Sequence, residues 1–169
     1  MGQVSVAQKL PEFPMVFNKF STSLIGTNQP IEPPAATKEL DWEAELAVVI
    51  GRTARNVRLD DALDYVAGYA AFNDVSARDL QLRSPQWAIG KGFDTSGPFG
   101  PCLVTADEIA DPQDLTMVGR LNGKVMQHSS TSLMIFSVAQ LIEYISQAIT
   151  LLPGDIIATG TPAQGSGVP

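Results

Sequence analysis

The sequence contains one cysteine and one histidine in 169 residues, and this scarcity narrows the chemistry open to it. A single cysteine excludes a disulfide within the chain and, with one histidine, leaves no set of sulfur and imidazole ligands for a metal. Cys102 stands in the apolar run Pro101-Cys102-Leu103-Val104, which is typical of a buried strand, so we expect it in the core and not as a nucleophile. His128 lies on the outgoing strand of an expected hairpin, where we expect it to be structural or exposed.

Basic clusters and long hydrophobic runs are missing as well. Eleven Lys and Arg residues face 18 Asp and Glu residues, and the formal net charge of -7 argues against nucleic acid or an anionic membrane as the main partner. No apolar run approaches the ~18–20 residues that span a bilayer. The N-terminus also lacks the basic-then-apolar pattern of a secretory signal, so the cytoplasm is the expected location.

The sequence has 44% hydrophobic residues, which is ordinary for a globular core, and its length predicts one domain over residues 1–169. Strands dominate the pattern, including residues 15–20 and a hairpin around Asn122-Gly123. The clearest helix covers residues 137–149, with Ser137 as its cap. We therefore expect a mixed, β-rich α+β fold with a mostly antiparallel or mixed sheet.

Two acids interrupt the entry to the most apolar strand. Glu43 and Glu45 precede the run from Leu46 to Ile50, and on a strand they share a face about 6.5–7 Å apart. Such a pair repels itself and needs a proton or a cation, and Asp74, at the end of a second apolar stretch, favours the cation. Three carboxylates favour a hard ion: Mg²⁺, Mn²⁺ or Ca²⁺. The alternative from spacing alone is a solvated strand face.

Six segments, in order along nearly the whole chain, resemble the fumarylacetoacetate hydrolase family. They are DWEAEL (residues 41–46), NDVSARD (73–79), QWAIGKGFDT (86–95), GPFGP (97–101), LNG (121–123) and PGDIIATGTP (153–162). Each segment alone is weak, but the ordered set is specific. The resemblance is to single-domain members that include acylpyruvate and diketo-acid hydrolases, and it implies a β-sandwich roll with short helices that forms a homodimer.

The resemblance also implies a site. Glu43, Glu45 and Asp74 match the family's ligands for Mg²⁺ (or Mn²⁺, with Ca²⁺ possible), and Lys91 matches its catalytic lysine. The positions that match substrate contacts are Arg78, Gln81 and Thr161. Lys91, Arg78 and Thr161 also have plainer alternatives from the residues alone. Lys91 could be a solvated loop lysine, Arg78 could form an i,i+4 salt bridge with Asp74, and Thr161 could cap a turn.

These positions imply a divalent-metal-dependent hydrolase that cleaves a C–C bond in a small β-diketo or 2-oxo acid, such as an acylpyruvate. The sequence departs from the family pattern in one respect. Relatives of this type carry a His–Glu pair on a lid, and no histidine precedes His128 here. We therefore keep two alternatives open: a 2-oxo acid decarboxylase or isomerase, and a catalytically silent metal-binding relative. The domain is expected to be incomplete at both ends.

Overall fold

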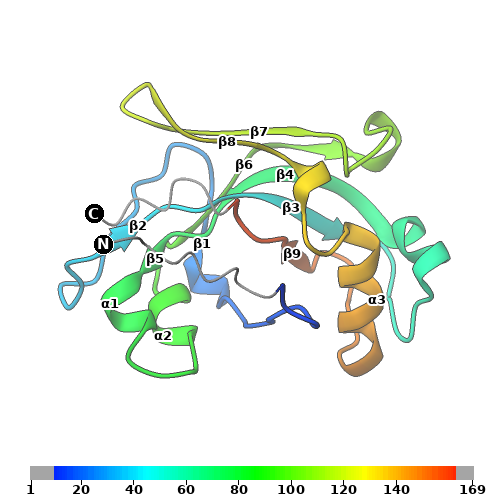
Figure 1. Ribbon diagram of the computed structural model, residues 1–169, viewed down its shortest axis with the longest axis horizontal. Helices are drawn as coiled ribbons and strands as arrows, with labels where there is room; N and C mark the ends of the chain where they lie inside the picture. The colour runs from blue at the N-terminus through cyan, green and yellow to red at the C-terminus, as the bar shows by residue number, and fades with distance from the viewer. Residues whose placement is uncertain (1–9, 163–169) are drawn as a thin grey trace, which may run out of the picture.

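The computed structural model describes residues 10–162, whose centre is a curled five-stranded sheet (Figure 1). In spatial order the strands are β1 (Leu24–Ile25), β6 (Gly97–Thr105), β4 (Val66–Asn73), β3 (Ala44–Ile50) and β9 (Ile156–Ala158). β1 runs parallel to β6, and the other neighbouring strands are antiparallel. The apolar run after Glu45 therefore forms β3, with β4 and β9 on its two sides.

Short elements surround this sheet. β2 (Leu40–Asp41) pairs with β5 (Ser76–Ala77), and β7 (Thr116–Leu121) pairs with β8 (Lys124–Ser130). The helices are α1 (Arg78–Gln81), α2 (Ala88–Lys91) and α3 (Val138–Ala148), and 3₁₀ turns cover Ser21–Ser23, Leu59–Tyr65, Ala106–Glu108 and Thr131–Leu133. The mixed, β-rich α+β class with short helices is confirmed.

The β7–β8 hairpin lies where the sequence predicted it. Asn122 and Gly123 join its strands with φ angles of 51° and 79°, and this left-handed pair suits the twist of a two-residue hairpin turn. Figure 1 shows the hairpin as a long ribbon above the sheet, and its outer side chains are largely exposed.

α3 covers one face of the sheet and closes the main core. Its amphipathic pattern buries Val138, Leu141 and Ile142 against apolar side chains that include Val48 of β3. The expected cap is confirmed: Ser137 Oγ accepts from Gln140 N at 3.2 Å, and the Gln140 side chain accepts from Ser137 N at 2.8 Å.

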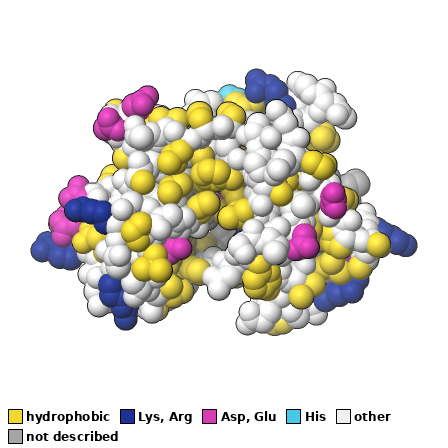
Figure 2. All heavy atoms as spheres, turned by 180° about the vertical axis from the view of Figure 1, so that it is seen from behind, with side chains coloured by type: hydrophobic (Ala, Val, Ile, Leu, Met, Phe, Trp, Pro, Cys, Tyr) yellow, Lys and Arg dark blue, Asp and Glu magenta, His cyan; other side chains and the backbone are white. Residues whose placement is uncertain are grey.

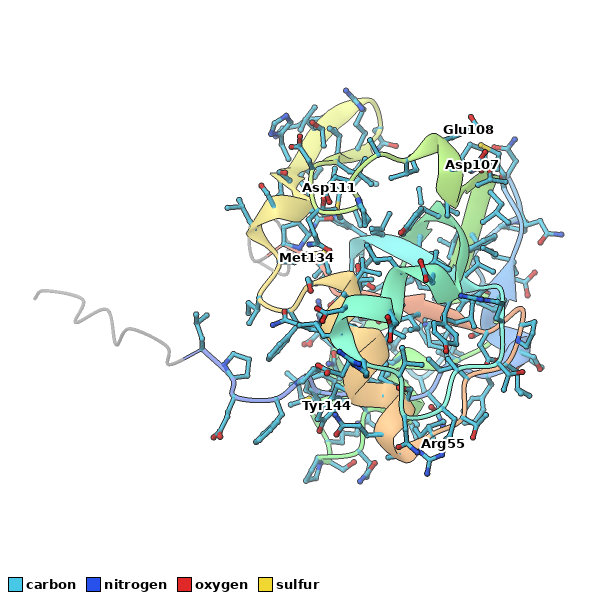
Figure 3. The ribbon with its side chains drawn as sticks, turned by 90° about the vertical axis from the view of Figure 1, so that its right-hand side faces the viewer. Arg55, Asp107, Glu108, Asp111, Met134 and Tyr144 are labelled. Atoms are coloured by element: carbon cyan, nitrogen blue, oxygen red, sulfur yellow. The ribbon has the colours of Figure 1, made fainter. Side chains whose placement is uncertain are left out.

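The far end of α3 is held by Arg55, seen beside it in Figure 3. Its Nη1 donates to the carbonyl oxygen of Ser146 at 2.7 Å and also to that of Gln147. A guanidinium at a helix C-terminus satisfies carbonyl groups that have no partner within the helix. Arg55 thus fastens the loop after β3 to the helix that covers it.

The other face of the sheet carries a second, smaller apolar cluster. Ala47, Ala70 and Phe72 form a separate minor cluster there. Figure 2, taken from behind, shows hydrophobic side chains around a hollow, and a cavity of ≈ 300 Å³ is lined by side chains that include Phe99 and Ile156. Because Glu45 lies two residues before Ala47 on β3, its side chain points to the same face of the sheet as Ala47.

Three local expectations from the sequence were wrong. Residues 15–20 form no strand and pair with no neighbouring strand. Residues 89–101, whose many Gly and Pro residues predict a loop without regular structure, contain the end of α2 and the start of β6. Cys102 is exposed, because the β4–β6 register jumps from Tyr69↔Val104 to Ala71↔Gly100 and leaves the residues between to bulge outward. None of the helices within residues 10–162 has the length and hydropathy that a membrane span requires.

Candidate metal centre

Three buried carboxylates meet where β3 begins and β4 ends. The antiparallel register pairs Ala44 with Asn73, so Glu43 lies opposite Asp74, and Asp74 N donates to Glu43 O at 2.9 Å. One carboxylate oxygen from each of Glu43, Glu45 and Asp74 lies within 4.8 Å of the others. Their exposed fractions are 7%, 6% and 1%, so the solvated strand face considered from spacing alone is wrong.

Two lysine ammonium groups lie inside this cluster. Lys91 Nζ is 2.6 Å from Glu43 Oε2 and 3.0 Å from Asp74 Oδ2. Lys19 Nζ lies 2.7 Å from the other Asp74 oxygen and also donates to Ser96 Oγ, at 2.9 Å, and to the backbone carbonyl of Lys91. Lys91 is 2% exposed, so it is not a solvated loop lysine. Burial lowers the pKa of the Lys19 amine, while Asp74 acts in the opposite direction.

Arg78 forms a second layer around Glu43. Its Nε and Nη2 donate to Asp41 Oδ2 at 2.9 and 2.7 Å, and Nη2 lies 2.5 Å from Glu43 Oε1. The remaining arm, Nη1, donates to Gln81 Oε1 at 2.8 Å. Arg78 therefore pairs with Asp41 and Glu43, and not with Asp74, the partner that helical spacing suggested. The strand β5 separates Asp74 from Arg78, so the two residues do not lie on one helix.

The Glu45 carboxyl has a raised pKa. Burial is the main cause and the neighbouring Asp74 and Glu43 carboxylates add to it, while the Gly160 N–H, 3.0 Å away, and Lys91 oppose it; together they raise the pKa of Glu45 to about 8. A carboxyl that is forced to keep its proton at neutral pH is relieved by a cation. Three buried oxygen donors from Glu43, Glu45 and Asp74 therefore fit a hard divalent ion.

Thr161 lies beside this cluster but is tied to the backbone. Its hydroxyl donates to Ala44 O at 3.0 Å and accepts from Gln127 Nε2 at 2.9 Å. His128, the neighbour of Gln127 on β8, is exposed. The structure therefore brings Glu43, Glu45, Asp74, Lys91, Arg78, Gln81 and Thr161 into one region and leaves the imidazole at the surface.

Sequence reasoning missed Lys19, Asp41 and Ser96, which complete the network. Lys19 belongs to the segment 15–20, whose alternation was interpreted as a strand. That alternation has another cause, because Phe17 and Lys19 both face the site. The Phe17 ring lies 5.5 Å from Lys91 Nζ and packs edge-on against Trp87 at 5.6 Å. A lysine at an alternating, otherwise apolar position was the available signal.

Comparisons with known proteins concern the family and the fold of the chain. The family model described as "Fumarylacetoacetate (FAA) hydrolase C-terminal" matches residues 1–169. Among curated proteins, oxaloacetate tautomerase Fahd2a, mitochondrial, from Rattus norvegicus is 48% identical over 155 residues, which is 91% of this chain and 50% of the relative. The chain thus spans about half the length of the curated relatives that it matches.

Solved structures share the fold. The 5-carboxymethyl-2-hydroxymuconate delta-isomerase from Mycobacterium smegmatis has a TM-score of 0.87 and 44% identity, covering 97% of this chain and 62% of that one. Fumarylpyruvate hydrolase from Pseudomonas aeruginosa, solved in complex with Mn²⁺ and pyruvate, has a TM-score of 0.82 and 33% identity, covering 89% and 68%. An isomerase, a tautomerase and a hydrolase thus all resemble this chain.

Proposed function

The chain belongs to the fumarylacetoacetate hydrolase family, and from this premise we propose that it forms the centre of a divalent-metal-dependent enzyme acting on small β-diketo or 2-oxo acids. The observation that carries the proposal is the buried cluster of Glu43, Glu45 and Asp74, with Lys91 Nζ shared between two of the carboxylates. Hydrolysis, tautomerisation and decarboxylation of such acids all pass through an enolate. A divalent ion and Lys91 would stabilise the negative charge of that enolate.

Under this proposal Glu43, Glu45 and Asp74 hold the ion, with Mg²⁺ or Mn²⁺ first and Ca²⁺ as an alternative. A bound divalent cation supplies Lewis acidity, which lowers the energy of an enolate oxygen. The Lys91 side chain, held by Glu43 and Asp74, would donate to the same oxygen. Arg78, Gln81 and Thr161 surround the substrate, and Arg78 also fixes the orientation of Glu43.

C–C bond hydrolysis is the first candidate reaction, and the relative named fumarylpyruvate hydrolase supports it. Hydrolysis consumes a water, which a base must activate. The second candidate is tautomerisation or decarboxylation of oxaloacetate. The relatives named oxaloacetate tautomerase favour it. Tautomerisation moves one proton between carbon and oxygen and consumes no water.

The experiment uses the full-length protein loaded with Mn²⁺ and compares wild type with Lys91→Met. Loss of acetylpyruvate absorbance reports hydrolysis, and the enol absorbance of oxaloacetate reports tautomerisation. Removing one donor to a developing oxyanion costs about 10²–10³-fold in kcat. Lys124→Met, which changes an exposed lysine at the hairpin turn, is the matched control. Equal rates for both variants on both substrates would remove Lys91 from the mechanism.

Assembly and location follow the family expectation and are part of the same proposal. We propose a homodimer, without nucleic acid or membrane as a partner. The cytoplasm is the proposed location, although several relatives carry "mitochondrial" in their names. Fractionation of the source cells, together with light scattering of the full-length protein, tests both points.

A further inference from the structure

Gln127 is the one buried residue in the strands of the β7–β8 hairpin, whose other positions are half-buried or exposed. It is 2% exposed, whereas its neighbour His128 is exposed. Across the hairpin Gln127 pairs with Gly119, where an added Cβ would lie 3.1 Å from Gln127 Oε1 and 3.4 Å from the Cβ of Ala44. A glycine inside a strand often marks the close approach of another segment, and here it lets the hairpin approach β3.

The Gln127 amide makes two hydrogen bonds at the start of β3. Its Oε1 accepts from Ala44 N at 3.0 Å, and its Nε2 donates to Thr161 Oγ1 at 2.9 Å. A backbone N–H can only donate, so Oε1 has to face Ala44 and Nε2 has to face Thr161. The Thr161 hydroxyl must then accept from Gln127 and give its only proton to Ala44 O, 3.0 Å away.

Ala44 lies between two of the three clustered carboxylate residues. The N–H of Glu43 is held by Asn73 Oδ1 at 2.9 Å, so side-chain amides fix two consecutive N–H groups at this entry to β3. On the other side, Gly160 N donates to Glu45 Oε2 at 3.0 Å, immediately before Thr161. One glutamine thus links the hairpin, the strand that carries Glu43 and Glu45, and the segment that carries Thr161.

We infer that Gln127 is a positioning residue: it holds the Glu43–Glu45 stretch and Thr161 as one unit and sets the hydrogen-bond polarity of the Thr161 hydroxyl. This inference rests on the proposed function, because it gives the unit a role in metal and substrate binding. Its consequence is chemical. With its proton given to Ala44, Thr161 Oγ1 offers a ligand only a lone pair, so it accepts from an O–H, such as that of an enol, and does not donate to a carboxylate.

The chain offers a matched control for a purely structural glutamine. Gln113 makes the same kind of bonds away from the cluster: its Oε1 accepts from Val138 N at 2.8 Å, and its Nε2 donates to Thr131 O at 3.0 Å. Gln127→Met and Gln113→Met each remove an amide that bonds main chain while keeping the length of the side chain. Both variants therefore lose an amide that bonds main chain, and only Gln127 lies beside the carboxylate cluster and Thr161.

The experiment measures Mn²⁺ affinity and steady-state kinetics in the full-length protein for Gln127→Met, Gln113→Met, Thr161→Val and the double variant Gln127→Met/Thr161→Val. Loss of a residue that supports metal ligands typically costs 10–100-fold in metal affinity or activity. We expect Gln127→Met to weaken Mn²⁺ binding by about tenfold and to raise KM, and Gln113→Met to lower only the Tm. The double variant should lose less in kcat/KM than the product of the two single losses, because the two residues act together.

The Mn²⁺ titration needs no turnover, so it separates this inference from the proposed function. If wild type binds Mn²⁺ but acts on none of the substrates, the proposed function fails, while a tenfold loss of affinity in Gln127→Met still supports the positioning role. If Gln127→Met behaves like Gln113→Met, with a lower Tm and unchanged Mn²⁺ affinity and KM, Gln127 is structural only. Single losses that multiply fully in the double variant would overturn the coupling to Thr161.

Discussion

Lys19 and Lys91 hold opposite oxygens of one carboxylate: Lys19 Nζ is 2.7 Å from Asp74 Oδ1 and Lys91 Nζ is 3.0 Å from Asp74 Oδ2. Lys19 also donates to the backbone carbonyl of Lys91. The lysine that the family pattern marks is therefore positioned at both ends, through its own ammonium and through a second lysine 72 residues earlier.

Lys19→Met should separate metal binding from turnover. The substitution removes a buried positive charge beside Asp74, so we expect Mn²⁺ affinity to stay level or to rise. Turnover should fall by about 10–100-fold, because Lys91 loses the group that holds its backbone. Calorimetric titration and steady-state kinetics on the full-length protein measure the two effects. A parallel loss of both would show that Lys19 supports the fold alone, and Lys124→Met serves as the control.

Glu45→Gln should have opposite effects on the metal-free and metal-loaded protein. Without metal, burial and then the Asp74 and Glu43 carboxylates hold the pKa of Glu45 at about 8, so folding at neutral pH requires that Glu45 take up a proton; the amide needs none, and the Tm should rise. Saturation of wild type at 100 times the Kd adds about 2.7 kcal/mol, or roughly 5–10 °C in Tm for a domain of this size. Glu45→Gln should lose most of that gain. Thermal unfolding in chelator and in Mn²⁺ gives both values, and an unchanged gain would exclude Glu45 as a ligand.

Metal affinity should increase with pH up to about 8. The folded pKa of Glu45 lies above its ordinary value of 4.5, so its proton stabilises the metal-free fold at low pH, and that stability is lost as pH rises toward about 8. The ion binds the deprotonated carboxylate, so its apparent affinity gains over the same range. Mn²⁺ titrations at several pH values between 5.5 and 8.5 measure this slope. A profile that is as steep in Glu45→Gln would assign the proton to another group.

Arg55→Ala should lower the free energy of unfolding and leave kcat/KM unchanged. The guanidinium donates to the carbonyl oxygens of Ser146 and Gln147 at the end of α3, and we expect a loss of about 1–2 kcal/mol in the free energy of unfolding. Arg58→Ala is the control: its contact with Asp60 is 3.7 Å long between exposed side chains, so its loss should stay below about 0.5 kcal/mol. Urea unfolding and kcat/KM together check this, and equal losses would show that Arg55 is not an anchor.

Periodicity accounts for what could be predicted of the site. Glu43 and Glu45 share a face because strands alternate with period two, and the apolar run after them marks β3. Asp74 joins them because an antiparallel partner returns to the same end. The hairpin at Asn122 and the cap at Ser137 were equally local signals, fixed by a turn and by a first helical turn.

What could not be predicted depends on contacts between distant segments. Lys19 meets Asp74 across 55 residues, and no spacing rule connects an extended segment to a strand end. The plainer alternative for Arg78 was a helical i,i+4 pair with Asp74, but the strand β5 lies between the two residues, and the guanidinium pairs with Asp41 and Glu43. Cys102 lies at a register jump between β4 and β6, which composition does not reveal.

The exposed position of Cys102 has a practical use in spectroscopy. It is the only cysteine among these 169 residues and lies on β6, separated from β3 by β4. A spin label or fluorophore on its thiol needs no background substitutions within this chain. With Mn²⁺ at the carboxylate cluster, the paramagnetic ion and the labelled thiol define one distance across the sheet. That distance reports directly, and without any enzyme assay, whether the ion lies at the meeting point of β3 and β4.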